Sequence, residues 1–244
     1  EGWNGSKNPW EYYFEPLNEY TVDDAMTNEH ITSDIFQVGN LDFDIDNKFL
    51  ISNLHSYIPL KLWVTNGSSK DKHRAEINKI VSKININSHI LEKIKKFSDN
   101  HSFEDTLGIH IRGTDKKTEQ RILKCIDIGI YIQKAEECLK NHKLSKIFIA
   151  SDTNEAIKRF IEHFGRNKII VYNCHRMNNY ESRVCLPLSS MAGPLLGEEA
   201  LIEAMLLSKC THFISSDSNM SSFPLYKNVD MSYDFISPYG EKYG

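Results

Sequence analysis

A short apolar segment, Leu107-Gly108-Ile109-His110-Ile111, ends abruptly at the polar residues Arg112-Gly113-Thr114-Asp115. Short apolar runs bounded by turn-forming residues are typical of buried β-strands. Because a strand points successive side chains to opposite faces, His110 and Arg112 are expected to share one face. The segment therefore predicts a buried strand that delivers charged groups to its carboxyl end.

Similar strand-like segments alternate with helical patterns along the rest of the chain. The helical pattern at residues 126–140 is expected to point four side chains inward, those of Ile130, Ala135, Cys138 and Leu139. The alternation is typical of an α/β fold with a parallel sheet covered by helices, and such sheets bind ligands at the carboxyl ends of their strands. The strand-like segments cover residues 107–111, 146–150, 168–172 and 212–215, and the helical patterns cover residues 126–140, 156–164 and 198–208.

The first hundred residues lack this alternation. Residues 75–97 have helical periodicity that is interrupted near Asn85-Ile86-Asn87, and the polar run Ser98-Asp99-Asn100-His101-Ser102 follows them. Polar clusters between periodic segments are typical of loops. We therefore place a boundary near residue 100, which divides the chain into an N-terminal region of residues 1–100 and a Rossmann-like domain of residues 101–244.

Composition narrows the classes of function. The chain has 244 residues, of which 40% are hydrophobic and 25% are charged, as in an ordinary globular protein. Its formal net charge of -4 argues against nucleic acid as a partner. No apolar run approaches the roughly 18 residues that a membrane span needs, and the polar opening Glu1-Gly2-Trp3-Asn4-Gly5 is not typical of a signal peptide. We expect a cytoplasmic protein, with association with a membrane surface as the open alternative.

Metal and disulfide chemistry find little support in the sequence. The cysteines show no C-x-x-C pair and no regular spacing, so we expect buried free thiols. The histidines form no H-E-x-x-H motif, and we expect no metal site. A serine-hydrolase elbow, G-x-S-x-G, and a phosphate-binding loop, G-x-x-x-x-G-K-[ST], are also absent. The five cysteines are Cys125, Cys138, Cys174, Cys185 and Cys210.

The segment from His110 to Glu119 carries the chemistry. It places several charged or strongly polar side chains directly behind an apolar strand, too many to bury without partners. An arginine at position 112 can donate two parallel hydrogen bonds to a phosphate and stabilise the negative charge of a leaving diphosphate. Gly113 lets the backbone approach such a ligand closely. The structural alternative, which stays open here, is an ion pair between Arg112 and Asp115 that holds a turn.

This segment resembles the H-x-R-R-T-D-K motif of the fucosyltransferase family that contains the core α1,6-fucosyltransferase of N-glycans and the rhizobial nodulation fucosyltransferase. Asn8-Pro9-Trp10-Glu11-Tyr12-Tyr13-Phe14-Glu15-Pro16 is similar to the W-E-x-x-F-x-P element late in the family's acceptor-side domain. Residues 197–210 and Ser216-Asp217-Ser218-Asn219 resemble its closing nucleotide-binding motifs. The resemblance implies a GT-B fold, in which residues 1–100 form part of the acceptor-side domain and residues 101–244 bind the nucleotide sugar.

The resemblance also implies roles for individual residues in nucleotide binding. It makes Arg112 the clamp on the diphosphate and places His110 and Glu203 beside the guanosine. It further makes Ser218 and Asn219 contacts to the phosphates.

Other positions bear on catalysis and on donor identity. Glu119 lies one residue closer to the arginine than the family's catalytic glutamate, and we predict it as the general base, with Asp115 as the alternative. Asp152, after the second strand-like segment, either contacts the ligand at the same edge or caps the following helix. Gly113 replaces the second arginine of the family's motif, so either Lys116 or Lys117 holds the diphosphate or the donor differs.

These residues predict an inverting, metal-independent glycosyltransferase that needs no cofactor. It is expected to transfer a sugar, fucose from GDP-fucose, to a glycan hydroxyl, so a GDP-sugar donor and a glycan acceptor are its expected partners. Two alternatives stay open. One is a GT-B transferase that uses another nucleotide sugar. The other, which Gly113 favours, is a non-catalytic module that binds a nucleotide or a glycan.

Overall fold

The computed structural model describes seven stretches of the chain. They are residues 10–16, 30–33, 49–52, 70–113, 126–178, 193–216 and 218–236. Among the predicted site residues, Asp115 and Glu119 lie outside these stretches, as do Lys116 and Lys117.

A parallel sheet of five strands forms the centre of the molecule, and the predicted α/β class is confirmed. Its strand order is β5-β4-β3-β6-β7, and every neighbouring pair is parallel. All five carboxyl ends therefore meet at one edge of the sheet, the carboxyl edge, and all five amino ends at the other, the amino edge. The strands are β3 (Thr106–Ile111), β4 (Lys146–Ser151), β5 (Ile169–Ile170), β6 (His212–Ser216) and β7 (Ser232–Ile236).

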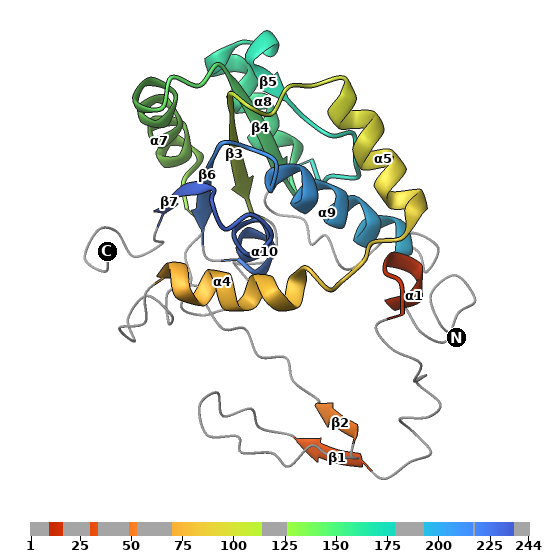
Figure 1. Cartoon of the computed structure of the whole chain (residues 1–244). Helices are drawn as coiled ribbons and strands as arrows, with labels where there is room; N and C mark the ends of the chain where they lie inside the picture. The colour runs from red at the N-terminus through yellow and green to blue at the C-terminus, as the bar shows by residue number, and fades with distance from the viewer. Residues whose placement is uncertain are drawn as a thin grey trace.

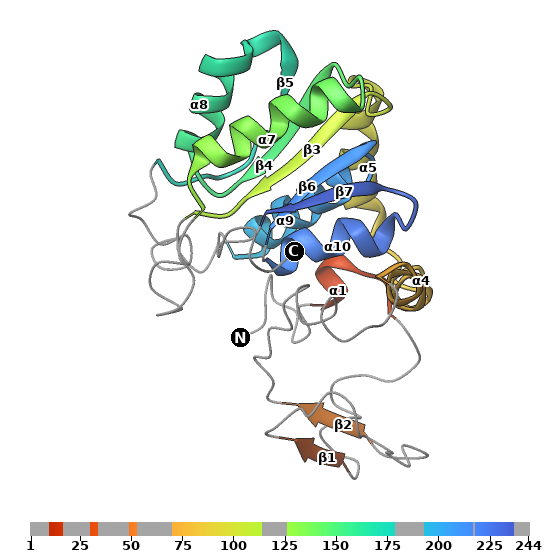
Figure 2. The same ribbon diagram turned by 90° about the vertical axis from the view of Figure 1, so that its left-hand side faces the viewer.

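Helices cover both faces of this sheet (Figure 2). On one face, α7 (Ile128–Asn141) and α8 (Asn154–Phe164) pack against Leu107, Ile109 and Ile111 of β3. On the other face, α5 (Ser88–Asp99), α9 (Gly193–Leu207) and α10 (Asn219–Lys227) pack against side chains of β4 and β6. Since successive strand residues alternate between faces, Gly108 and His110 of β3 face the α9 and α10 side.

The remaining helices and strands come from the N-terminal half of the chain, and one short 3-10 helix lies before β5. The helix α4 (Lys70–Val81) lies against α10, and α1 (Trp10–Tyr13) lies against the N-terminal end of α9 (Figure 1). The strands β1 (His30–Ser33) and β2 (Phe49–Ser52) pair with each other in parallel as a separate sheet. A short 3-10 helix, η2 (Arg166–Lys168), precedes β5. The domain boundary near residue 100 remains a prediction.

The element α1, which carries the W-E-x-x-F similarity, is attached to α9 by two tyrosines. The Tyr13 hydroxyl donates to the carbonyl of Pro194 at 3.0 Å, and the Tyr12 hydroxyl donates to Oε2 of Glu198 at 3.1 Å. Lys93 of α5 pairs with Oε1 of the same carboxylate at 2.5 Å. Glu198, which is 2% exposed, thus joins α1, α5 and α9.

Most elements agree with the sequence prediction, and the differences are informative. The interruption predicted near residues 85–87 separates α4 from α5, as expected. In α7 the prediction for Ile130 is wrong, because it is 49% exposed, whereas Tyr131 lies buried on one helical face with Ala135 and Cys138. The helix α10 had no counterpart in the prediction, since Pro224 inside it disfavours a helix. The strand β7 was not predicted either.

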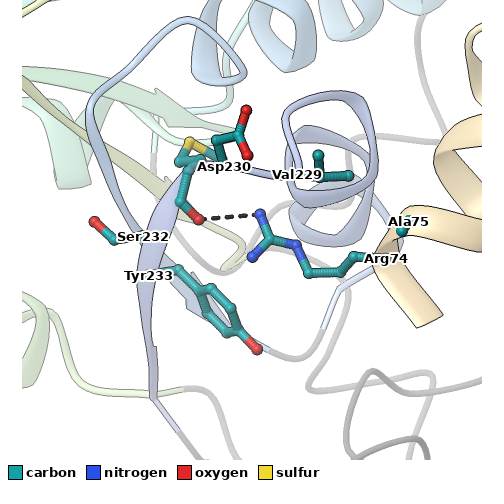
Figure 3. Close-up of a pocket in the computed structure, with 7 residues that line it drawn as sticks. Arg74, Ala75, Val229, Asp230, Ser232 and Tyr233 are labelled. Carbon is teal, nitrogen blue, oxygen red and sulfur yellow. Dashed lines mark hydrogen bonds between the residues drawn. The ribbon is translucent and has the colours of Figure 1, made fainter. Parts of the chain in front are cut away.

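Arg74 of α4 donates hydrogen bonds to three backbone carbonyls at the amino edge, close to β7. Its Nε donates to the Leu225 carbonyl at 3.0 Å, and its Nη2 donates to the carbonyls of Asn228 at 2.7 Å and Met231 at 3.0 Å. The guanidinium lies 5.3 Å from the centre of the Tyr233 ring (Figure 3). Arg74 is only 6% exposed, so a buried charge satisfies one carbonyl in the last turn of α10 and two carbonyls that follow the helix.

No helix in the described stretches is both long enough and apolar enough to cross a lipid bilayer.

Candidate functional site

Several predicted site residues lie together at the carboxyl edge of the sheet. Arg112 and Gly113 directly follow β3, Asp152 directly follows β4, and Ser218 comes two residues after β6. The strands β4, β3 and β6 are neighbours, so their parallel pairing brings these residues to adjacent positions. The edge therefore presents an arginine, a carboxylate and a hydroxyl where open α/β sheets bind ligands.

Asp152 holds the turn that follows β3. Its Oδ1 and Oδ2 accept the backbone N–H of Gly113 at 2.9 and 3.2 Å. The N-cap of α8 is instead Thr153, whose side chain accepts from the backbone N–H of Ala156. The interpretation of Asp152 as a helix cap is therefore wrong, and its carboxylate fixes the backbone next to Arg112.

His110 connects β3 to α10. It is 4% exposed, and its Nδ1 lies 2.7 Å from the hydroxyl oxygen of the fully buried Ser221, within hydrogen-bond distance. Arg112 comes two residues later and is partly exposed. Arg112 lies one residue beyond β3, and the alternation of strand side chains predicts that it shares the face of His110.

Two buried hydroxyls at this edge have no hydrogen-bond partner among the described residues. In the stretches that the structure describes, Ser215 Oγ and Ser218 Oγ are the buried side-chain oxygens without a hydrogen bond. Ser218 occupies the N-cap position of α10, yet its side chain accepts no capping bond. An unsatisfied buried polar group costs about 1–3 kcal/mol. Since the N-terminus of a helix attracts anions, these hydroxyls indicate a binding site for a phosphate or carboxylate.

The predicted nucleoside contact Glu203 has a partner that sequence reasoning missed. Its Oε1 lies 2.5 Å from Nη2 of Arg176 and accepts from the Cys174 thiol at 3.4 Å. The side chains of Glu203 and Arg176 are 6% and 4% exposed. Burial raises the pKa of the Glu203 carboxyl, and the Arg176 guanidinium opposes that rise.

The residues on either side of Arg176 are hydrogen-bonded to α9 and to the residues that follow β4. His175 donates its backbone N–H to Oε2 of Glu199 at 2.8 Å, and its Nδ1 lies 2.9 Å from Oε1. Met177 donates its N–H to the carbonyl of Asp152 at 2.9 Å and accepts from the N–H of Asn154 at 2.8 Å. Residues 172–178 thus run alongside the carboxyl end of β4 as a fixed segment.

The remaining predicted residues are described in part or not at all. Asn219 is the first residue of α10, which places its backbone at the carboxyl edge. The predicted bases Glu119 and Asp115 lie outside the described residues, so the general base stays a prediction. The ion pair between Arg112 and Asp115 likewise stays an alternative.

One group of potential metal ligands occurs in the described residues, away from this edge. The ligand atoms of Cys138, His212 and Asp234 lie within 4.8 Å of one another. The Cys138 thiol donates to Asp234 Oδ2 at 3.2 Å, and His212 Nε2 lies 2.9 Å from the same oxygen. Burial, helped by Asp234, raises the pKa of the Cys138 thiol to about 12, which keeps the proton on sulfur. These hydrogen bonds hold the three side chains together.

Solved fucosyltransferase structures are similar to this chain. One structure of fucosyltransferase NodZ from Bradyrhizobium is 16% identical with a TM-score of 0.46, over 94% of this chain and 78% of that chain. Another is 21% identical with a TM-score of 0.41, over 61% of this chain and 44% of that chain. POFUT1 in complex with GDP is 13% identical with a TM-score of 0.46, over 79% of this chain and 57% of that chain.

These likenesses are distant. The chain spans less than half of the length of the second NodZ structure, 44%. No protein-family model and no curated protein matches the sequence. At these identities and TM-scores, the comparison assigns neither a family nor an activity.

Proposed function

We propose that the chain is the nucleotide-sugar-binding part of an inverting, metal-independent glycosyltransferase that transfers fucose from GDP-fucose to a glycan hydroxyl. The observation that carries the proposal is the pair of buried hydroxyls without described partners, Ser215 and Ser218, at the same edge as Arg112. The N-terminus of α10 and a guanidinium are the groups that bind a diphosphate in proteins. The motif resemblance from His110 to Glu119 supports guanosine as the nucleoside and fucose as the sugar.

The chemistry of this reaction needs two protein groups. The acceptor oxygen attacks the anomeric carbon of fucose, the bond from that carbon to the β-phosphate oxygen breaks, and GDP leaves with the bonding electrons. A base removes the proton of the acceptor hydroxyl, and a cationic group stabilises the developing charge on the diphosphate. We assign the first role to Glu119 and the second to Arg112.

The non-catalytic alternative has one sequence observation in its favour. Gly113 stands where the fucosyltransferase motif has a second arginine, so one cationic group that would hold the diphosphate is absent. The site would then hold a nucleotide without stabilising the leaving group enough for transfer. A nucleotide-binding module and an enzyme differ in turnover, because only the enzyme releases GDP when it is given donor and acceptor.

The proposal is tested by melting the protein with GDP, UDP, CMP and dTDP sugars in the presence of EDTA. A ligand that binds only the folded state raises the free energy of unfolding by about 2.7 kcal/mol at a hundredfold excess over Kd. We expect GDP-fucose to raise the melting temperature most, and an acceptor mixture to release GDP from it. Stabilisation by a different nucleotide would contradict the donor, and a strict requirement for manganese would contradict the metal-independent mechanism.

A further inference from the structure

Arg176 is a buried cation that no sequence motif explains. Its Nη1 donates to the Ser151 carbonyl, and its Nη2 donates to the Tyr172 carbonyl at 2.8 Å and to Glu203 Oε1 at 2.5 Å. A buried guanidinium is stable only when hydrogen bonds and an opposite charge replace its water. Arg176 therefore joins the end of β4, the segment after β5 and the helix α9 at one point.

The contact of Arg176 with Ser151 is connected to the turn after β3 through the next residue, Asp152. Ser151 precedes Asp152, whose carbonyl accepts the N–H of Met177 at 2.9 Å. The carboxylate of Asp152 in turn accepts the N–H of Gly113 at 2.9 Å. Asp152 is thus held through its backbone by residues 176–177, and its side chain holds Gly113.

We propose that Arg176 is a positioning residue for the turn of Arg112 and Gly113. It fixes the carboxyl end of β4, so that Asp152 holds the Gly113 backbone and keeps Arg112 oriented toward the diphosphate. This inference rests on the proposed function, in which Arg112 is the diphosphate clamp. The contacts themselves run from Arg176 through Ser151 and Asp152 to Gly113.

The bonding pattern indicates why the residue is an arginine. A planar guanidinium presents several N–H donors in fixed directions, whereas an ammonium is a compact charge that does not reproduce that fork. Arg176 uses two of its nitrogens for two carbonyls and a carboxylate. A lysine would keep the pairing with Glu203 but lose carbonyl contacts, so charge alone should not preserve the position of Asp152.

The first test measures amide hydrogen exchange at Gly113 and needs no nucleotide. Arg176→Gln is expected to speed exchange of the Gly113 N–H, because the carboxylate that protects it loses its fixed backbone. The matched control is Arg74→Gln, which removes another buried arginine with three carbonyl acceptors, 6% exposed, at the amino edge. The control should destabilise the protein and leave the protection of Gly113 relative to global unfolding unchanged. Equal exchange at Gly113 in parent and Arg176→Gln would overturn the proposal, and Arg176→Lys serves if the glutamine variant does not fold.

The second test is a double-mutant cycle on GDP affinity with Arg176→Lys and Asp152→Ala. If Arg176 acts through Asp152, each change should raise the Kd for GDP on the order of tenfold, and the double variant should be no worse than the weaker-binding single variant. Arg74→Lys is the control for lost stability: it should leave the Kd for GDP unchanged, both alone and in the Asp152→Ala background. Additivity of Arg176→Lys with Asp152→Ala would overturn the inference. A parent protein that binds no GDP would contradict the proposed function, and the exchange at Gly113 would still decide whether Arg176 positions the turn.

Discussion

The amino and carboxyl edges of the five-stranded sheet differ in how they satisfy their polar groups. At the amino edge, Lys146 Nζ donates to the Asn167 carbonyl at 2.7 Å, Thr106 Oγ1 donates to the Ser102 carbonyl at 2.9 Å, and Arg74 binds three carbonyls. At the carboxyl edge, Ser215 and Ser218 bury hydroxyls that have no hydrogen bond in the described residues. The hydrogen bonds at the amino edge stabilise the fold. The unsatisfied hydroxyls at the carboxyl edge lower the stability of the fold and favour the binding of a ligand that supplies the missing hydrogen bonds.

The largest effect is expected at the carboxyl edge, on turnover. If Glu119 is the base, Glu119→Gln should lower kcat by about 10²–10⁴-fold, because an amide cannot accept the acceptor's proton. The Kd for GDP should stay near the parent value, since the base acts on the acceptor hydroxyl. Steady-state kinetics and calorimetric titration with GDP measure the two quantities. Unchanged turnover would move the base to another residue, with Asp115 as the next variant.

The amino edge should respond in stability alone. Arg74→Gln leaves carbonyls at the end of α10 without their charged donor, and we expect it to lower the free energy of unfolding by about 3 kcal/mol. Urea unfolding measures this loss. GDP affinity of the folded variant should match the parent, and a large loss of GDP affinity would show that the two edges are coupled.

A hydroxyl at the carboxyl edge should affect stability and binding in opposite directions. Ser218→Ala removes a buried oxygen that has no described partner, so it should raise the free energy of unfolding by up to about 1 kcal/mol. The same change should weaken GDP binding if the hydroxyl contacts a phosphate. Thermal melting with and without GDP reports both effects. Ser221→Ala is the matched control, because it removes a hydroxyl that is bound to His110 and should destabilise the protein.

A further effect on stability depends on pH and concerns a histidine at the start of β6. Burial lowers the pKa of His212 in the fold, below its ordinary value of about 6.5. Below that pH the unfolded chain takes up a proton that the folded chain does not, so stability should fall as the pH drops, by at most about 1.4 kcal/mol per pH unit. Melting temperatures at a pH of about 7.5 and about 5.5 measure the slope. His212→Asn should reduce it, and an identical slope in both proteins would assign the pH dependence elsewhere.

The parts of the fold that depend on local pattern were predictable from sequence. The strands β3, β4 and β6 are apolar runs that end in polar residues, and their ends were found within one residue or so. In contrast, α10 contains Pro224, which disfavours a helix in the sequence. Packing of other α10 residues, such as Leu225, in the hydrophobic core stabilises the helix nonetheless. The site residues at the ends of β3 and β4 followed from the same patterns.

Long-range partners in the site were not predictable in this way. Arg176 and Glu203 are 27 residues apart and share no local motif, so only the fold shows that they form a buried pair. The sequence pattern around Asp152 also cannot distinguish a helix cap from a residue that binds the Gly113 N–H. Nor does it show that the Ser218 hydroxyl has no hydrogen bond in the described residues. These hydrogen bonds depend on tertiary structure, which brings residues distant in sequence into contact.

The central claim, that Arg112 binds a diphosphate at the carboxyl edge, is tested most directly by titrating GDP into folded Arg112→Lys and Arg74→Lys. An ammonium cannot reproduce two parallel charge-assisted bonds worth about 1.5–3 kcal/mol each, so Arg112→Lys should weaken GDP binding roughly tenfold or more at a nearly unchanged melting temperature. Arg74→Lys should lower the melting temperature and keep the parent affinity. A lower melting temperature with unchanged GDP affinity in Arg112→Lys would instead mean that Arg112 only holds a turn, and it would contradict the account.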